Sequence, residues 1–164
     1  MADNNKISFQ DYLEITNLVS QWSTSYDTKD WDSLRLCLAP SSCLDFRSLQ
    51  GELHENLTPD NYVAILEKMI GDRRLKTQHF LGVSTWTHLG EGSVEVVHQV
   101  RAAHQRYKDE TLTEVANKGH GHGFVYKRFR KHADGWKIES VRPELDWAEY
   151  DLHGTLASPE KKSE

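Results

Sequence analysis

Apolar residues recur at helical spacing in the first half of the chain and alternate with polar residues in much of the second half. Ser8 and Asp11 form a pattern typical of the start of a helix, in which the serine caps the first turn. The residues that follow repeat every three or four positions, which predicts one buried face on this helix. That face comprises Tyr12, Ile15, Val19, Trp22 and Tyr26.

A second, shorter helix is predicted for residues 30–38, where Trp31 and two leucines follow the same spacing. Pro40 should end this helix, because proline lacks the N–H donor that a helix interior needs. Residues 42–49 then predict a strand, which carries Asp45 and Phe46.

The third predicted helix begins at Thr58 and Pro59, a pattern in which threonine is the N-cap and proline takes the first helical position. Gly71 is suited to be its C-cap. The expected apolar face comprises Tyr62, Ile65, Leu66 and Met69.

Residues 76–107 have the pattern of two long strands joined by a tight turn. The turn at residues 89–93 contains Gly90 and Gly92, which can adopt the positive φ angles that a hairpin requires. On the return strand one face carries valines, Ala102 and two histidines at alternate positions. A hairpin centred on this turn would bring His79 opposite His104, or within one residue of it.

A third long strand is predicted for residues 112–130, followed by a turn at residues 132–135. Its glycines at 119, 121 and 123 suggest a bulge, a bend or the close approach of another backbone or a bound molecule. The last strand should span residues 136–141 and end at Pro143, and residues 146–156 could pack back on the body of the protein.

This order of elements predicts an α+β fold, because the helices are segregated from a meander of antiparallel strands. We expect a curved, cone-shaped antiparallel sheet, a partial barrel capped by helices, with an interior pocket for a small apolar molecule. The 164 residues suffice for a single domain with a core of about residues 7–156, and the termini should be frayed.

Composition narrows the possible functions. Hydrophobic residues make up 37% of the chain, enough for a core, and the net charge of −5 comes without any basic run that would bind nucleic acid. The only two cysteines, Cys37 and Cys43, lack the spacing of a zinc site and are too few for a disulfide scaffold. Neither a signal peptide nor an apolar run of membrane-spanning length is present, so an intracellular protein without membrane contact is expected.

Several kinds of catalytic site have weak support. His120 and His122 point to one side of a strand, but no Cys, Asp or Glu follows at metal-ligand spacing, so we expect no metal. No serine-nucleophile motif is present, and the turn around Gly90 lacks the helix that a phosphate loop needs.

The remaining candidates are two histidines and a Tyr-Asp pair. Taken alone, His79 and His104 are more typical of ordinary polar strand residues, and Tyr26-Asp27 of a helix-end cap or a surface turn. They become a candidate site if Asp27 binds one imidazole, because a carboxylate fixes the ring tautomer and raises the basicity of the other nitrogen.

Five segments between about Ile7 and Leu156 match the pattern of one known family. They are Phe9-x-Asp11-Tyr12-Leu13, Ser25-Tyr26-Asp27-x-Lys29-Asp30-Trp31-Asp32, Thr77-Gln78-His79-Phe80, His104-Gln105-Arg106-Tyr107-Lys108-Asp109 and Lys118-Gly119-His120-x-His122. On these residues the chain resembles scytalone dehydratase, a fungal family of melanin biosynthesis with the cone-shaped fold of the nuclear transport factor 2-like superfamily. The resemblance implies a homotrimer that removes water from a hydroxylated ring ketone without metal or organic cofactor.

The resemblance also implies a role for each candidate residue. His79 would be the acid–base residue that moves the proton next to the carbonyl. His104 would bind the substrate and be oriented by Asp27. Tyr26 would polarise the carbonyl through a water molecule, so that the developing enolate is stabilised.

The chain departs from the family at the pocket. Phe46 stands where the family has a second tyrosine, Gly123 and Val125 where it has a serine and an asparagine, and Leu152 and Leu156 where phenylalanines cover the pocket. These changes suggest a larger or less polar substrate than scytalone. The substrate-binding residues that we predict are Phe46, Leu49, Met69, Gly123, Val125, Leu152 and Leu156.

The sequence therefore favours a lyase that dehydrates a scytalone-like or vermelone-like polyketide ketone, in pigment or other secondary metabolism. An isomerase or cyclase acting on a larger hydroaromatic polyketide, and a non-catalytic small-molecule binder, are the alternatives. We expect the enzyme in the cytoplasm, or associated with endosomes or vesicles of secondary metabolism.

Overall fold

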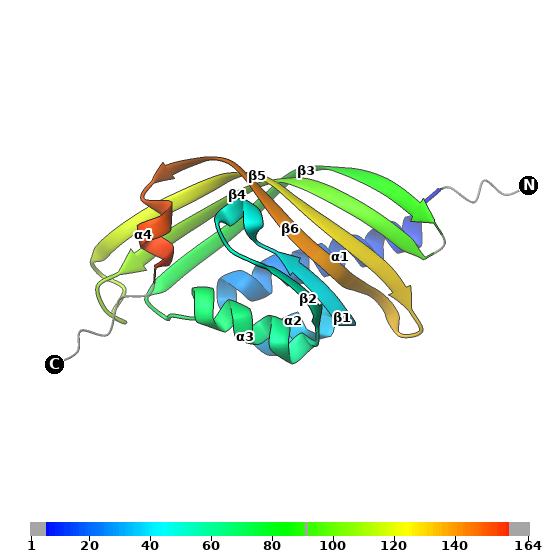
Figure 1. Ribbon diagram of the computed structural model, residues 1–164, viewed down its shortest axis with the longest axis horizontal. Helices are drawn as coiled ribbons and strands as arrows, with labels where there is room; N and C mark the ends of the chain where they lie inside the picture. The colour runs from blue at the N-terminus through cyan, green and yellow to red at the C-terminus, as the bar shows by residue number, and fades with distance from the viewer. Residues whose placement is uncertain (1–5, 91, 158–164) are drawn as a thin grey trace, which may run out of the picture.

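In the computed structural model, which describes residues 6–90 and 92–157, helices cover one face of a long, curved sheet (Figure 1). The predicted tip of the hairpin at Glu91 and the predicted frayed segment 158–164 lie outside the described residues. The helices are α1 (Phe9–Thr28), α2 (Trp31–Cys37), α3 (Pro59–Ile70), α4 (Leu152–Leu156) and a 3₁₀ turn, η1 (Arg47–Leu49). The strands are β1 (Leu38–Asp45), β2 (Leu53–Leu57), β3 (Leu75–Gly90), β4 (Ser93–Tyr107), β5 (Val115–His132) and β6 (Gly135–Tyr150).

The described strands form one open sheet in the order β2-β1-β6-β5-β4-β3. Strands β3 to β6 form the antiparallel meander that the sequence predicts. Strand β1, however, runs parallel to β6, so the sheet is mixed and not purely antiparallel. A parallel neighbour needs a long connection, and most of the chain lies between these two strands.

The predicted helix caps are present. The Ser8 side chain accepts a hydrogen bond from the Asp11 N–H (3.0 Å), and Thr58 accepts one from the Asn61 N–H (3.3 Å). The predicted face of α1 is buried except at Tyr12, which is 44% exposed because it lies in the first turns and packs on Trp86 near the hairpin tip.

The segment between α2 and α3 differs from the prediction. Pro40 lies inside β1 and does not simply end a helix; it falls in a stretch where the pairing of β1 with β6 is interrupted, so its missing N–H breaks no ladder bond. The predicted strand 42–49 ends at Asp45, and Arg47–Leu49 forms η1. Strand β2 was not predicted, because its burial is low and shows no clear alternation.

The last strands are also longer or shifted. Strand β5 begins at Val115, three residues later than expected. Strand β6 continues through Pro143 to Tyr150, which corrects the prediction that proline ends it. Strand β1 pairs with β6 only as far as Val141, so Pro143 has a partner strand on one side alone, where it pairs with Val125 of β5.

The three alternate glycines of β5 permit close approach of the chain to itself. A Cβ on Gly119 would lie 2.2 Å from the Leu152 Cα, and a Cβ on Gly123 would lie 1.9 Å from the Glu144 carbonyl oxygen. The pairing of β5 with β6 is also irregular between His122 and Gly123. Both the bulge and the close approach suggested by the sequence are therefore present.

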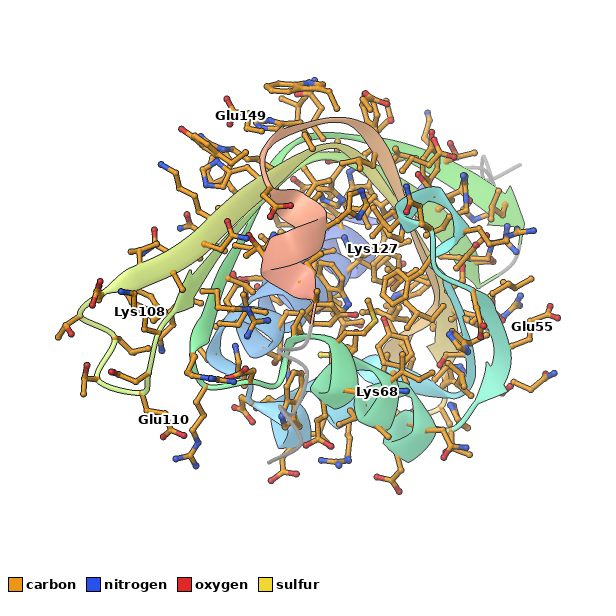
Figure 2. The ribbon with its side chains drawn as sticks, turned by 60° about the vertical axis from the view of Figure 1, so that its left-hand side comes forward. Glu55, Lys68, Lys108, Glu110, Lys127 and Glu149 are labelled. Carbon is orange, nitrogen blue, oxygen red and sulfur yellow. The ribbon has the colours of Figure 1, made fainter. Side chains whose placement is uncertain are left out.

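The core lies between α1, α3 and the inner face of the sheet. One charged side chain, that of Lys127, lies inside it with no exposed surface (Figure 2). Its Nζ stands 4.0 Å from the centre of the Trp22 ring and has no hydrogen-bond partner among the described residues. Burial lowers the pKa of Lys127 to about 7.

None of the helices in the described part of the chain is long and apolar enough to cross a membrane.

Candidate active site

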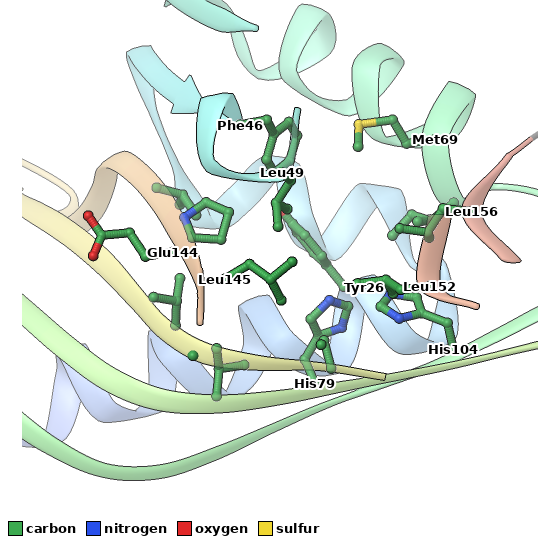
Figure 3. A pocket seen from close by; sticks show the side chains of 18 of the residues that line it. Tyr26, Phe46, Leu49, Met69, His79, His104, Glu144, Leu145, Leu152 and Leu156 are labelled. Atoms are coloured by element: carbon green, nitrogen blue, oxygen red, sulfur yellow. The ribbon is translucent and has the colours of Figure 1, made fainter. Parts of the chain in front are cut away.

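A cavity opens between the inner face of the sheet and helices α1, α3 and α4 (Figure 3). The space free of atoms in and before it is about 820 Å³, including the part that opens to solvent. The histidines lie on the sheet side, and Phe46 and Met69 lie on the opposite side. The lining includes ten of the residues predicted from the sequence: Tyr26, Phe46, Leu49, Met69, His79, His104, Gly123, Val125, Leu152 and Leu156.

His79 and His104 face each other in this cavity, although not in the register that we predicted. His104 pairs with Thr77, and His79 pairs with Ala102, so the two histidines are two residues out of step. They remain on the same face of the sheet because side chains alternate with a period of two. Their ring centres are 5.9 Å apart and the rings are perpendicular.

Asp27 binds His79, not His104 as the family resemblance implied. One carboxylate oxygen lies 2.7 Å from His79 Nδ1, and the other accepts the His79 backbone N–H at 2.9 Å. The Thr77 hydroxyl donates to the first oxygen at 3.0 Å. Because a carboxylate oxygen only accepts, this geometry places the imidazole proton on Nδ1 and leaves the lone pair on Nε2.

The position of Asp27 follows from the fold. Strand β3 is an edge of the sheet, so the His79 N–H has no strand partner on its outer side. The last turn of α1 runs beside this edge and supplies Asp27 to fill that place.

His104 has a different environment. It is buried, and its Nδ1 has no hydrogen-bond partner in the described part of the chain. Burial, assisted by the nearby His79, lowers the pKa of His104 to about 4. The ring is therefore neutral near pH 7, and because it lines the cavity it is available to a polar group of a ligand.

Tyr26 completes the polar part of the cavity. Its ring lies 5.4 Å from that of His79 and 4.4 Å from that of Trp22. Its hydroxyl forms a 2.7 Å hydrogen bond with the hydroxyl of Tyr62 on α3. Burial raises the pKa of both Tyr26 and Tyr62, so both phenols keep their protons at neutral pH.

The rest of the lining is mostly apolar. Phe46 and Val125 bring no polar atom, and helix α4 covers the opening with Leu152 and Leu156. At Gly123 the β6 backbone occupies the space that a side chain would fill, and β6 places Leu145 in the cavity.

His120 and His122 lie on β5 with their side chains on the far face of the sheet from the two facing histidines. Glu149 from β6, which the sequence pattern did not bring near them, stands 3.3 Å from one ring and 3.2 Å from the other. The guanidinium group of Arg101 also lies in this cluster, 3.1 Å from His120 Nδ1. In residues 6–90 and 92–157 no group of three or more His, Cys, Asp or Glu residues is placed to hold a metal ion.

Sequence reasoning missed Thr77, Leu145 and the role of Tyr62. Thr77 belongs to the same motif as His79 and could have been noticed there. Tyr62 was assigned to the apolar face of α3, where a buried phenol should have prompted a search for its partner.

Comparison with known proteins identifies the family to which this chain is similar. The model of the scytalone dehydratase family matches residues 6–162. The chain is 39% identical over 153 residues to scytalone dehydratase of Colletotrichum orbiculare, covering 92% of this chain and 81% of that protein. It is 38% identical over 152 residues to dehydratase AgnL8 of Paecilomyces divaricatus, covering 92% and 87%.

The fold recurs in solved structures. The Kfla4162 protein of Kribbella flavida superposes with a TM-score of 0.74 at 23% identity, covering 85% of this chain and 93% of that one. The predicted α+β fold of the nuclear transport factor 2-like kind is therefore confirmed, with an open, mixed sheet. The matches in sequence also confirm the resemblance, and this chain belongs to the scytalone dehydratase family of hydro-lyases.

Proposed function

We propose that this chain, folded as one domain, is a cofactor-free dehydratase that removes water from a hydroxylated cyclic polyketide ketone in fungal pigment or other secondary metabolism. The observation that carries the proposal is the Asp27–His79 pair, which stands in the cavity wall beside a neutral His104 and the phenol of Tyr26. A protein that only binds a ligand has no need for an imidazole oriented in this way.

The first chemical step is the removal of a proton. Nε2 of His79 takes the proton from the carbon next to the substrate carbonyl, and the C–H electrons move towards the carbonyl oxygen. Asp27 holds the ring in the required tautomer and stabilises the imidazolium that forms. Tyr26 donates a hydrogen bond to the developing oxyanion.

The second step expels water. The electrons return from the enolate to form a C=C bond as the bond between the next carbon and its hydroxyl breaks. The leaving oxygen takes the proton from the imidazolium of His79, which restores the neutral ring, and departs as water. His104 is placed to bind a polar group of the substrate, because its ring lines the cavity 5.9 Å from that of His79.

The lining suggests a substrate that is less polar than scytalone at the end remote from His79. Phe46 and Val125 offer no hydrogen bond, and Gly123 has no side chain to offer one. A polar group placed against these residues would lose its water without gaining a partner. An apolar extension of the ring system would fit the same surface better.

The homotrimer implied by the family has support from the outer face of the sheet. Phe80, Arg101, His122 and Trp147 form one row across β3, β4, β5 and β6. Phe80 is 64% exposed and Trp147 is 54% exposed. Exposed apolar side chains gathered on one face are typical of a protein–protein contact.

The test of the proposal is to incubate the protein with scytalone and follow the absorbance of the product. His79→Asn should lower kcat by about 10²–10⁴-fold, because it removes the acid–base group. Asp27→Asn should lower kcat by about the same order, because an amide in place of the carboxylate favours the wrong tautomer. Circular dichroism checks that both variants remain folded.

His88→Asn is the matched control, because His88 lies on the same strand but outside the cavity lining. It should retain the parent rate. Parent-like turnover by His79→Asn would contradict the proposed mechanism. A folded parent that fails to dehydrate scytalone would instead redirect the search to larger, less polar hydroxylated ketones.

A further inference from the structure

The hydroxyl of Tyr62 lies directly behind the hydroxyl of Tyr26, away from the cavity. The two oxygens are 2.7 Å apart, and each residue comes from a different helix. Tyr26 lines the cavity, whereas Tyr62 does not and has no exposed surface. Substrate can therefore touch Tyr26 but not Tyr62.

The direction of this hydrogen bond is set when a ketone binds. A carbonyl oxygen only accepts, so the Tyr26 hydroxyl must donate the hydrogen bond to the substrate. Its oxygen can then only accept from Tyr62, which must act as the donor.

We propose that Tyr62 is a positioning residue that donates to Tyr26 and so strengthens the hydrogen bond from Tyr26 to the substrate carbonyl. This inference rests on the proposed function. A phenol whose oxygen accepts a hydrogen bond becomes a better donor, because successive hydrogen bonds polarise one another in a low-dielectric interior.

This arrangement accounts for Phe46. The cavity wall has no hydroxyl at that position to act beside Tyr26. The second hydroxyl is that of Tyr62 on α3, which binds the hydroxyl of Tyr26 and acts through it without contact with the substrate. The wall thus stays apolar while the carbonyl is still polarised by a connected pair of phenols.

The kinetic test is a double-mutant cycle with Tyr62→Phe and Tyr26→Phe on scytalone. Tyr62→Phe should lower kcat about tenfold, the usual value of one hydrogen bond, with KM within about twofold of the parent. In the Tyr26→Phe background, Tyr62→Phe should have no further effect on kcat, because the residue through which it acts is gone. Additive effects, or an unchanged kcat for Tyr62→Phe, would overturn the proposal.

Tyr12→Phe is the matched control, because Tyr12 is a partly exposed phenol on the same helix as Tyr26. It should behave as the parent in every assay. Thermal denaturation of all variants separates a loss of folded protein from a loss of rate.

A second readout does not depend on turnover. The carbonyl ¹³C shift of labelled 1-tetralone, an unreactive bicyclic ketone, reports how strongly the bound carbonyl is polarised. The shift should move upfield in Tyr62→Phe relative to the parent, and in the same direction as in Tyr26→Phe. Equal shifts in the parent and Tyr62→Phe would overturn the role of Tyr62. Failure of the parent to dehydrate scytalone would bear on the choice of substrate alone, because the tetralone readout needs no turnover.

Discussion

Gly123 is the position at which a change from the family pattern can be tested most directly. The family resemblance places a serine there, yet a Cβ at Gly123 would lie 1.9 Å from the Glu144 carbonyl oxygen and 3.0 Å from the Asp146 nitrogen. Both atoms belong to the backbone of β6, so no side-chain rotation can relieve the contact. Restoring the family's serine would therefore require β6 to move.

The size of the effect follows from the distances. Real Cβ contacts are essentially never shorter than 3.0 Å, so the strand must shift by at least about 1.1 Å at Glu144. Overpacking of this kind costs roughly 1–3 kcal/mol, and each ladder hydrogen bond that is lost adds about 1 kcal/mol. Gly123→Ala should therefore destabilise the protein by roughly 2–4 kcal/mol, which lowers Tm by about 5–15 °C for a chain of this size.

Gly82→Ala on β3 is the matched control. Its added methyl group would meet the Gln99 Cβ at 3.4 Å, an ordinary contact, so Tm should stay within a few degrees of the parent. Differential scanning calorimetry of the parent and both variants measures the difference. If Gly123→Ala and Gly82→Ala melt at the same temperature, the close approach of β6 to β5 does not constrain this site and the reasoning fails.

Two further predictions concern the core and the outer face. Lys127→Met should stabilise the protein by roughly 2–4 kcal/mol at pH 7. The substitution removes the free-energy cost of burying the lysine, which its lowered pKa reflects, but it also loses the contact of the ammonium group with the Trp22 ring. Urea unfolding should show that this gain in stability shrinks as the pH rises from 7 towards 10.5, because the lysine of the unfolded chain then also loses its proton. A gain that does not change with pH would contradict this explanation. Light scattering should show that Phe80→Glu converts a trimer to smaller species. Leu36→Glu on α2, where the side chain is about equally exposed, should leave the trimer intact. A parent protein that is monomeric would refute the trimer.

Local signals in the sequence predicted local structure well. Ser8 and Thr58 cap their helices as expected, because a cap depends on residues only three positions apart. The glycine turn and the alternating residues likewise gave the β3–β4 hairpin. Proline was a poorer guide, since Pro40 and Pro143 are both tolerated where a neighbouring strand is absent or out of register.

Long-range pairings account for the errors. The parallel contact of β1 with β6 joins segments almost a hundred residues apart, and no local pattern specifies it. The Asp27–His79 contact depends on α1 lying along the sheet edge. The Tyr26–Tyr62 contact depends on the packing of α1 beside α3, so the periodicity of either helix alone could not show it.

The hairpin register explains why the error in pairing did not displace the site. The turn would pair His79 with His104, but the β3–β4 ladder is irregular between His88 and Gly90 and again between Leu81 and Ser84. Each irregularity moves the pairing by one residue, and a shift of one residue turns a strand's side chains to the opposite face. A single bulge would have placed His79 on the outer face. Two bulges return it to the cavity, beside Asp27 and across from His104, where the proposed proton transfer requires it.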